Sequence, residues 1–170
     1  MYDNILYPTD GSAGSEAAAA HVREIASAFD ATVHVLHVVD TREGGLGLSG
    51  AFQEEESQAM SGRSPDEGYI GRHEGEADTD EIEDELAAHA KELMEGPSDS
   101  LDGIDLRTAV EMGTPHSAIL RYADENDVDL VVMGTHGRTG VERYLLGSVA
   151  EKVVRMADQP VVTVRADEGE

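Results

Sequence analysis

The alternation of apolar, β-branched runs with helix-forming segments is the feature that most limits what this chain can fold into. The apolar runs are short and end in turn-like residues such as TDGS, which is typical of strands. The order βαβαβαβαβ predicts an α/β fold: a five-stranded parallel sheet with right-handed crossovers and helices on both faces. The expected strands are residues 4–8, 31–40, 104–113, 127–134 and 160–165, and the expected helices are residues 13–28, 79–95, 114–126 and 148–157.

Two helix starts carry recognisable signals. Thr114 followed by Pro115 predicts an N-cap and a first helical residue. The sequence SVAE predicts a capping box, with Ser148 as the N-cap and Glu151 as the third helical residue. The last two helices are therefore expected to begin directly after Thr114 and Ser148.

One segment does not follow the pattern. Residues 43–78 are rich in glycine and acidic residues and lack sustained periodicity, so they are expected to form a flexible insertion. With 170 residues, the chain is long enough for one domain with a good core and short for two. A single domain over residues 1–166, interrupted by this insertion, is the expected organisation.

The charge balance is strongly acidic. The chain has 36 Asp and Glu residues against 12 Lys and Arg, a formal net charge of −24. Such a surface repels itself at low ionic strength, whereas in molar salt the Debye length falls to about 3 Å and the repulsion is screened. The composition therefore favours a halophilic protein, and it argues against binding nucleic acid through a phosphate-attracting surface.

Several functional classes are excluded by what the sequence lacks. There is no cysteine, so there is no disulfide, thiolate metal site or thiol nucleophile. The N-terminal residues begin a strand rather than a signal peptide, and no apolar run approaches the roughly 20 residues of a membrane span. A cytoplasmic protein without a membrane partner is expected.

Two other patterns do not meet the requirements of the sites they suggest. GLGLSG at residues 45–50 has the spacing GxGxxG, but it does not lie in a strand-to-helix turn, so a dinucleotide fingerprint is not supported. A P-loop motif is absent from the sequence. His34 and His37 are three residues apart on a predicted strand, which directs them to opposite faces and prevents them from binding one metal ion.

The loop after the fourth predicted strand is the strongest candidate for a binding site. Gly134, Gly137, Gly147 and Ser148 could form a nest of backbone N–H groups at a helix N-terminus, where phosphate binds well. The same residues would also serve as an ordinary turn and helix cap, and local physics leaves both readings open. In a parallel sheet this loop and the segment PTDGS would meet beyond the carboxyl ends of the strands.

The spacing of these residues resembles a known signature. Gly134, Gly137, Gly147 and Ser148 read as G-x2-G-x9-G-S, which is similar to the nucleotide-binding signature of the universal stress protein family. ILYPTDGS, VHVLHVVD and PVVTVR also resemble that family in order and spacing, over roughly residues 2–42 and 80–166. The resemblance implies a Rossmann-like fold of the adenine nucleotide alpha hydrolase type.

The resemblance also implies a site. ATP would be bound with Mg²⁺ or Mn²⁺ held through its phosphates, and Asp10 would contact the adenosine portion in a turn shared with Pro8 and Thr9. The backbone of Val38 would recognise adenine. The remaining implied contacts, to ribose and phosphates, are Met133, Gly134, Gly137, Gly147, Ser148 and Val149, with Arg138 as a further phosphate ligand.

Three functions are compatible with this reading. The first is an ATP-binding stress-response protein that acts as a nucleotide-dependent binding module or switch, and that forms a homodimer through the last strand, residues 160–165. The second is a slow ATPase or nucleotidyl transferase, for which the loop offers only Thr135, His136 and Ser148. The third is a dimeric scaffold that binds no nucleotide.

Overall fold

The protein forms a five-stranded parallel sheet with helices on both faces, as the sequence predicts. The structure is a computed structural model that describes residues 1–40, 79–136 and 146–166, so the predicted insertion at residues 43–78 lies outside the described residues. The sheet has the order β3-β2-β1-β4-β5. Its elements are β1 (Asn4–Pro8), α1 (Ala13–Phe29), β2 (Thr32–Val39), α3 (Thr79–Ser100), β3 (Leu106–Met112), α4 (Pro115–Glu125), β4 (Leu130–Gly134), α5 (Ser148–Met156) and β5 (Val161–Val164).

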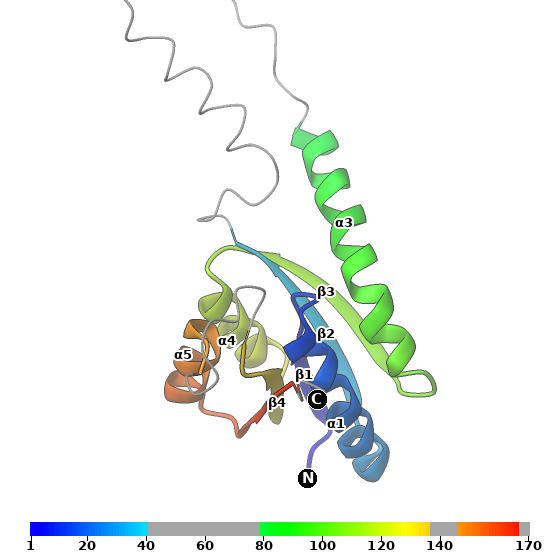
Figure 1. The fold of residues 1–170 in the computed structure, drawn as a ribbon, viewed down its shortest axis with the longest axis vertical. Helices are drawn as coiled ribbons and strands as arrows, with labels where there is room; N and C mark the ends of the chain where they lie inside the picture. The colour runs from blue at the N-terminus through cyan, green and yellow to red at the C-terminus, as the bar shows by residue number, and fades with distance from the viewer. Residues whose placement is uncertain (41–78, 137–145, 167–170) are drawn as a thin grey trace, which may run out of the picture.

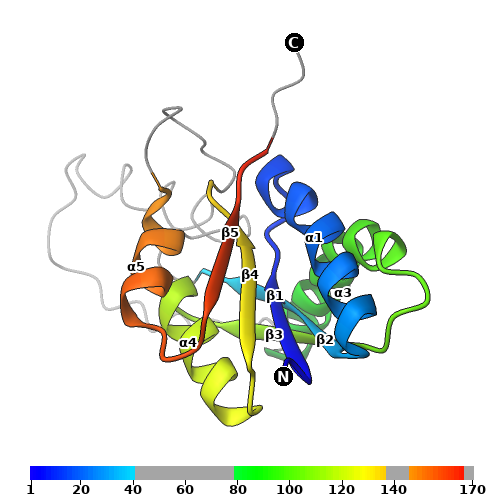
Figure 2. The ribbon, with the colours of Figure 1, turned by 90° about the horizontal axis from the view of Figure 1, so that it is seen from below.

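The molecule has three layers. Helices α1 and α3 cover one face of the sheet and α4 and α5 cover the other, as Figures 1 and 2 show. Alternate strand residues enter the two cores, because successive side chains in a strand point to opposite faces. Ile5 and Tyr7 pack on the α1 side, whereas Leu6 packs on the α4 side. The central strands are therefore apolar on both faces.

The two strand histidines follow the same rule. His34 is buried toward α4, where Tyr122 lies, and His37 is buried on the other face of β2. The sequence-based prediction that they point to opposite faces of the strand is confirmed.

Helix α3 is longer than predicted. It was expected to end before Gly96 and Pro97, but it continues to Ser100. Pro97 lies in the last turn, where a missing N–H removes only one hydrogen bond from the helix. The Ser100 hydroxyl donates to the Gly96 carbonyl at 3.2 Å and ties this turn together. Leu101, which follows directly, is fully buried and anchors the helix end in the core.

The connectivity reverses between β1 and β4. From β1 the chain crosses through α1 to β2 on one side, while β4 is followed by α5 and β5 on the other side. A crevice at the carboxyl ends of the strands forms where such a reversal occurs, and ligands of α/β proteins bind there. The reversal brings the loops after β1 and β4 together.

Candidate functional site

The loop after β1 is held by its own side chains. The Ser12 N–H donates to Asp10 Oδ1 at 3.0 Å, which orients the carboxylate over the turn. Thr9 is buried, and its hydroxyl accepts from the Gly11 N–H at 3.3 Å and lies 3.2 Å from Ser15 Oγ. Pro8, the last residue of β1, is also buried. Three of the predicted site residues, Pro8, Thr9 and Asp10, thus lie in one hydrogen-bonded turn.

The first turn of α1 is anchored to β1 beneath that loop. Ser12 is the N-cap, and its hydroxyl accepts from the Ser15 N–H at 3.3 Å. The Tyr7 hydroxyl donates to the Ser15 carbonyl at 2.6 Å. Burial raises the pKa of Tyr7 to about 12, against the opposing effect of its hydrogen bond with Thr9, so the phenol stays protonated and remains a donor. The sequence-based prediction did not include Ser12 or Ser15.

Gly134, at the end of β4, packs directly against the backbone of Gly14 in α1. A Cβ added to Gly134 would lie 2.5 Å from the Gly14 carbonyl carbon, and one added to Gly14 would lie 2.5 Å from the His136 carbonyl oxygen. Any side chain at either position would force the helix away from the strand. Gly134 therefore has a packing role that needs no ligand, and Gly14, which was not predicted, is its partner.

The two described ends of the loop after β4 meet. The Gly147 N–H donates to the Thr135 carbonyl at 2.7 Å, and the Thr135 N–H donates to the Val164 carbonyl of β5 at 2.8 Å. The Ser12 hydroxyl lies 3.4 Å from the His136 carbonyl and joins this loop to the loop after β1. A continuous set of contacts therefore runs from Asp10 through Ser12 to the start of α5. The predicted site residues Gly137 and Arg138 lie outside the described residues.

The start of α5 differs from the predicted capping box. Gly147 is the N-cap and Ser148 is the first helical residue, and among the described residues no side chain caps this helix. Glu151 lies one position too far along to reach back, and its carboxylate pairs instead with Arg155 one turn later. The prediction that Ser148 caps the helix is wrong, because the glycine before it already has the extended backbone of a cap, with ψ of 153°. The predicted N-cap of α4 at Thr114 is confirmed, without a side-chain cap bond.

The other predicted residues lie at the same end of the sheet. Met133 is buried in β4, Val38 is half-buried near the end of β2, and Val149 is half-buried in the first turn of α5. Ser148 itself is exposed. The described residues that were predicted from the sequence therefore converge on the carboxyl ends of β1, β2 and β4 and on the N-terminus of α5.

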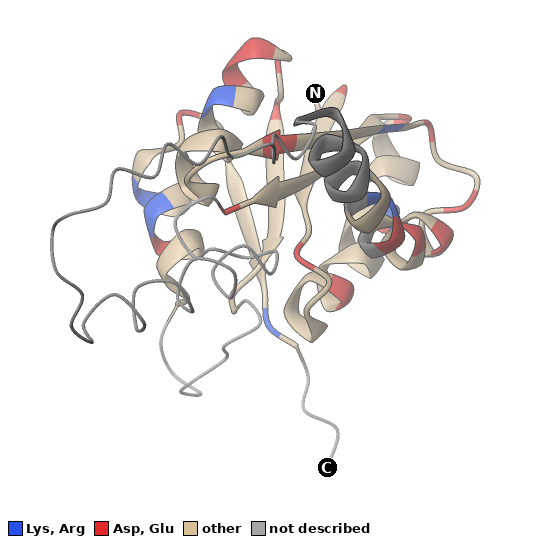
Figure 3. Ribbon diagram, turned by 90° about the horizontal axis from the view of Figure 1, so that it is seen from above, with Lys and Arg blue, Asp and Glu red and all other residues tan. Residues whose placement is uncertain are grey.

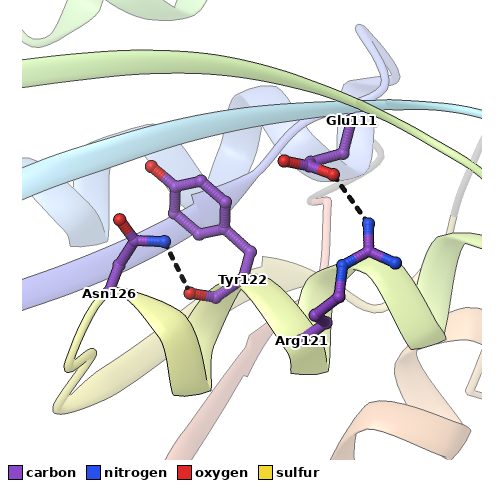
Figure 4. Close-up of polar contacts among 4 residues, drawn as sticks. All are labelled: Glu111, Arg121, Tyr122 and Asn126. Carbon is purple, nitrogen blue, oxygen red and sulfur yellow. Dashed lines mark hydrogen bonds and ion pairs between the residues drawn. The ribbon is translucent and has the colours of Figure 1, made fainter.

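A second set of polar contacts lies between the sheet and α4. His34 Nδ1 lies 3.1 Å from the Tyr122 hydroxyl, and burial, more than the nearby Arg107 charge, lowers the pKa of His34. Figure 4 shows Tyr122 pointing from α4 toward the sheet, beside the ion pair between Arg121 and Glu111 at 2.7 Å. These contacts join α4 to the sheet and are structural.

The described surface offers no ready metal centre. Within residues 1–40, 79–136 and 146–166, no group of three or more His, Asp or Glu side chains is arranged to hold a metal ion. Figure 3 marks the acidic and basic positions on the ribbon, and in the whole sequence Asp and Glu outnumber Lys and Arg. None of the described helices is long and apolar enough to cross a bilayer.

Comparison with known proteins gives consistent results. A model of the universal stress protein family matches residues 1–165. Universal stress protein MJ0577 of Methanocaldococcus jannaschii is 31% identical, over 97% of this chain and 96% of its own. The solved structure of MJ0577 superposes with a TM-score of 0.72 at 30% identity and covers 99% of both chains.

More distant structures share the fold. A universal stress protein in complex with cAMP has a TM-score of 0.59 at 22% identity, with 98% of each chain covered. One from Archaeoglobus fulgidus in complex with dAMP has a TM-score of 0.54 at 19% identity, with 96% of this chain and 98% of that chain covered.

Proposed function

The chain belongs to the universal stress protein family, and from that premise we propose that it is an ATP-binding stress-response protein that acts as a nucleotide-dependent binding module or switch. The nucleotide lies across the carboxyl ends of β1, β2 and β4, with its phosphates at the N-terminus of α5. Structures of more distant family members in complex with cAMP and dAMP support an adenine nucleotide as the ligand class.

The observation that carries this proposal is the uncapped start of α5. No described side chain caps the helix, so the N–H groups of Val149 and Ala150 lack the cap bond that most helix starts have, and the Ser148 N–H has no partner within the helix. These donors and the positive end of the helix dipole favour an anion. The contacts from Gly147 through Thr135 and His136 to Ser12 bring the start of α5 close to the turn that carries Asp10, which supports a phosphate site there.

Asp10 and the loop after β4 have separate roles in the proposal. Asp10 accepts from the ribose hydroxyl groups, because its carboxylate is oriented by the Ser12 N–H at the edge of the turn. Gly137, Arg138 and Gly147 surround the phosphates together with Ser148. Mg²⁺ or Mn²⁺ is bound through the phosphates.

The setting of the protein forms part of the proposal. The chain works in the cytoplasm at high salt, which the net charge of −24 favours. It forms a homodimer through β5, which lies at the edge of the sheet and is only partly buried along Val161, Val162 and Thr163. Pairing with β5 of a second copy would provide hydrogen-bond partners for the backbone N–H and C=O groups along that edge.

Proline at position 148 provides a sharp test of the phosphate site. Ser148→Pro removes the backbone N–H and the hydroxyl, yet proline is favoured as the first residue of a helix and the extended Gly147 before it suits a following proline. Ser148→Ala removes the hydroxyl alone. If the N–H binds phosphate, Ser148→Pro weakens ATP binding by about tenfold or more, the effect of a charge-assisted hydrogen bond, and weakens AMP binding much less.

Thermal unfolding gives a readout for both variants. Saturating ATP with Mg²⁺ raises the stability of the wild type, by about 2.7 kcal/mol when the ligand exceeds its Kd by about 100-fold. Equal stabilisation of the wild type and Ser148→Pro by ATP would show that the start of α5 is not the phosphate site. Measured ATP turnover at a rate above background would favour the enzyme alternative.

A further inference from the structure

The imidazole of His37 occupies a special place at the end of the β1–β2 ladder. The Thr9 N–H donates to the Leu36 carbonyl at 2.9 Å, which continues the parallel ladder one residue beyond the Pro8–Leu36 pair. His37 Nδ1 then lies 3.0 Å from the Thr9 carbonyl. His37 is 7% exposed, and its contact with the Thr9 carbonyl is buried. The Thr9 carbonyl is the acceptor that the next backbone N–H of β2 would use if the ladder continued. The His37 side chain contacts this carbonyl instead.

The direction of the β2 backbone shows which N–H that is. Thr32 and Leu36 bond to β1 through their backbone, whereas Val33 and Val39 bond to β3. Because the direction alternates along a strand, the N–H and C=O of Val38 face the β1 side. The next rung would run from the Val38 N–H to the Thr9 carbonyl, and no such bond is present among the backbone hydrogen bonds of the described residues.

We propose that His37 is a positioning residue that ends the β1–β2 ladder at Thr9 and so directs the backbone N–H and C=O of Val38 to the base of the bound nucleotide. This inference rests on the proposed function. It makes His37 a determinant of base specificity, although its own ring is buried beneath the turn and does not touch the base.

The chemistry of the base explains the specificity. One extended residue offers a donor and an acceptor side by side, and adenine presents the complementary pair, the N7 acceptor and the N6 amino donor. Guanine presents two acceptors, N7 and O6, along the same edge, so one of them would face the Val38 carbonyl. A buried polar group left unpaired in this way is strongly disfavoured. If the Val38 N–H instead donated to the Thr9 carbonyl, it would no longer be available to the base, and the discrimination between adenine and guanine would weaken.

The hydrogen bond to Thr9 also defines the tautomer of the His37 imidazole. The Thr9 carbonyl can only accept, so Nδ1 of His37 carries the proton and donates. An asparagine side chain can place an amide N–H near the position of Nδ1, whereas leucine cannot donate. Comparing His37→Asn with His37→Leu therefore separates the hydrogen bond from the size of the side chain.

The test is the ratio of the affinities for ATP and GTP, measured by calorimetry with Mg²⁺ present. His37→Leu is expected to lower this ratio by about tenfold, the equivalent of one hydrogen bond, while His37→Asn retains the wild-type ratio. His34→Leu is the matched control, because His34 is also buried in β2 but faces α4. It should reduce stability without changing the ratio.

The outcomes separate this inference from the proposed function. If the wild type binds no adenine nucleotide, the proposed function is wrong, and the role of His37 that rests on it is wrong as well. If the wild type prefers ATP and folded His37→Leu keeps the same ratio, the role assigned to His37 is wrong.

Hydrogen exchange of the wild type provides a second test that needs no variant. The Val38 amide should exchange faster than the Leu36 amide without nucleotide and become protected when ATP binds. Equal protection of both amides in the absence of nucleotide would overturn the inference.

Discussion

Gly14 and Gly134 lie backbone to backbone, so that a Cβ on Gly134 would come within 2.6 Å of the Gly14 carbonyl oxygen. This approach brings the N-terminus of α1 onto the end of β4 and sets the spacing between the two loops of the proposed site. Both glycines therefore contribute to the fold before any ligand binds.

Alanine at either glycine is expected to destabilise the protein. Within a helix, alanine is favoured over glycine by about 1 kcal/mol, which would make Gly14→Ala stabilising on propensity alone. The added Cβ would instead lie 2.5 Å from the His136 carbonyl oxygen, and overpacking of this kind costs about 1–3 kcal/mol. Chemical denaturation should show a lower free energy of unfolding for Gly14→Ala and for Gly134→Ala.

Ser27→Ala controls for helix propensity, since residue 27 is an exposed position of the same helix. It should leave stability unchanged or raise it slightly. Wild-type stability of both glycine variants would contradict the close approach seen in the structure.

Acid is expected to weaken the attachment of β1 through Asp129. Its Oδ2 accepts from the N–H groups of Asn4 and Asp3, each at 2.9 Å, and these bonds hold the pKa of Asp129 below its ordinary value. A carboxylate with a depressed pKa contributes stability above its unfolded pKa of about 3.9, and this contribution is lost as the pH falls through the folded value. Asp129→Asn should therefore be less stable at neutral pH and lose less on acidification.

The net charge complicates this comparison, because removing any carboxylate relieves repulsion. Asp102→Asn removes the same charge at an exposed position and serves as the control. The free energies of unfolding of Asp129→Asn and Asp102→Asn should be compared from neutral pH to below pH 4. If they are equal throughout, the two backbone hydrogen bonds of Asp129 make no measurable contribution to stability.

A second pH effect is expected nearer neutrality, from His34. Burial lowers the pKa of His34, so the unfolded chain takes up the proton first. Stability is complete above the unfolded pKa of about 6.5 and declines as the pH falls below it. Denaturation curves between pH 8 and 5 should show a shallower decline for His34→Gln than for the wild type. His21→Gln, which removes an exposed imidazole of α1, is the control for the loss of one histidine.

Salt is expected to stabilise the protein. With a formal net charge of −24, repulsion acts over a Debye length of about 10 Å at 0.1 M salt and about 3 Å at 1 M. The melting temperature should rise steeply between these concentrations of KCl and more slowly beyond them. A melting temperature that does not change with KCl would contradict the halophilic proposal.

The element order could be predicted from the sequence because short apolar or alternating strand patterns are separated by four segments with helical periodicity. The end of α3 could not, since Gly96 and Pro97 are local stop signals, while the burial of Leu101 that overrides them is a tertiary effect. The capping box failed for a similar reason. Ser148 and Glu151 have the right spacing, but the position of Gly147 is set by its hydrogen bond to Thr135.

Some residues of the candidate site could be predicted from the sequence and others could not. Asp10 and Gly134 could be identified because their spacing resembles a family signature. Gly14 and His37 were missed, since their roles depend on which backbone groups of β4 and β1 lie opposite them. A single glycine in a helix and a single histidine in a strand carry no such information in the sequence alone.

Calorimetric titration of the wild-type chain with ATP and Mg²⁺ in molar KCl, alongside GTP, tests the central claim most directly. The proposed site predicts saturable binding of a single ATP per chain, a lower affinity for GTP, and loss of binding in Asp10→Ala but not in Asp102→Ala. No binding of ATP, ADP or AMP at millimolar concentration to the folded protein would contradict it.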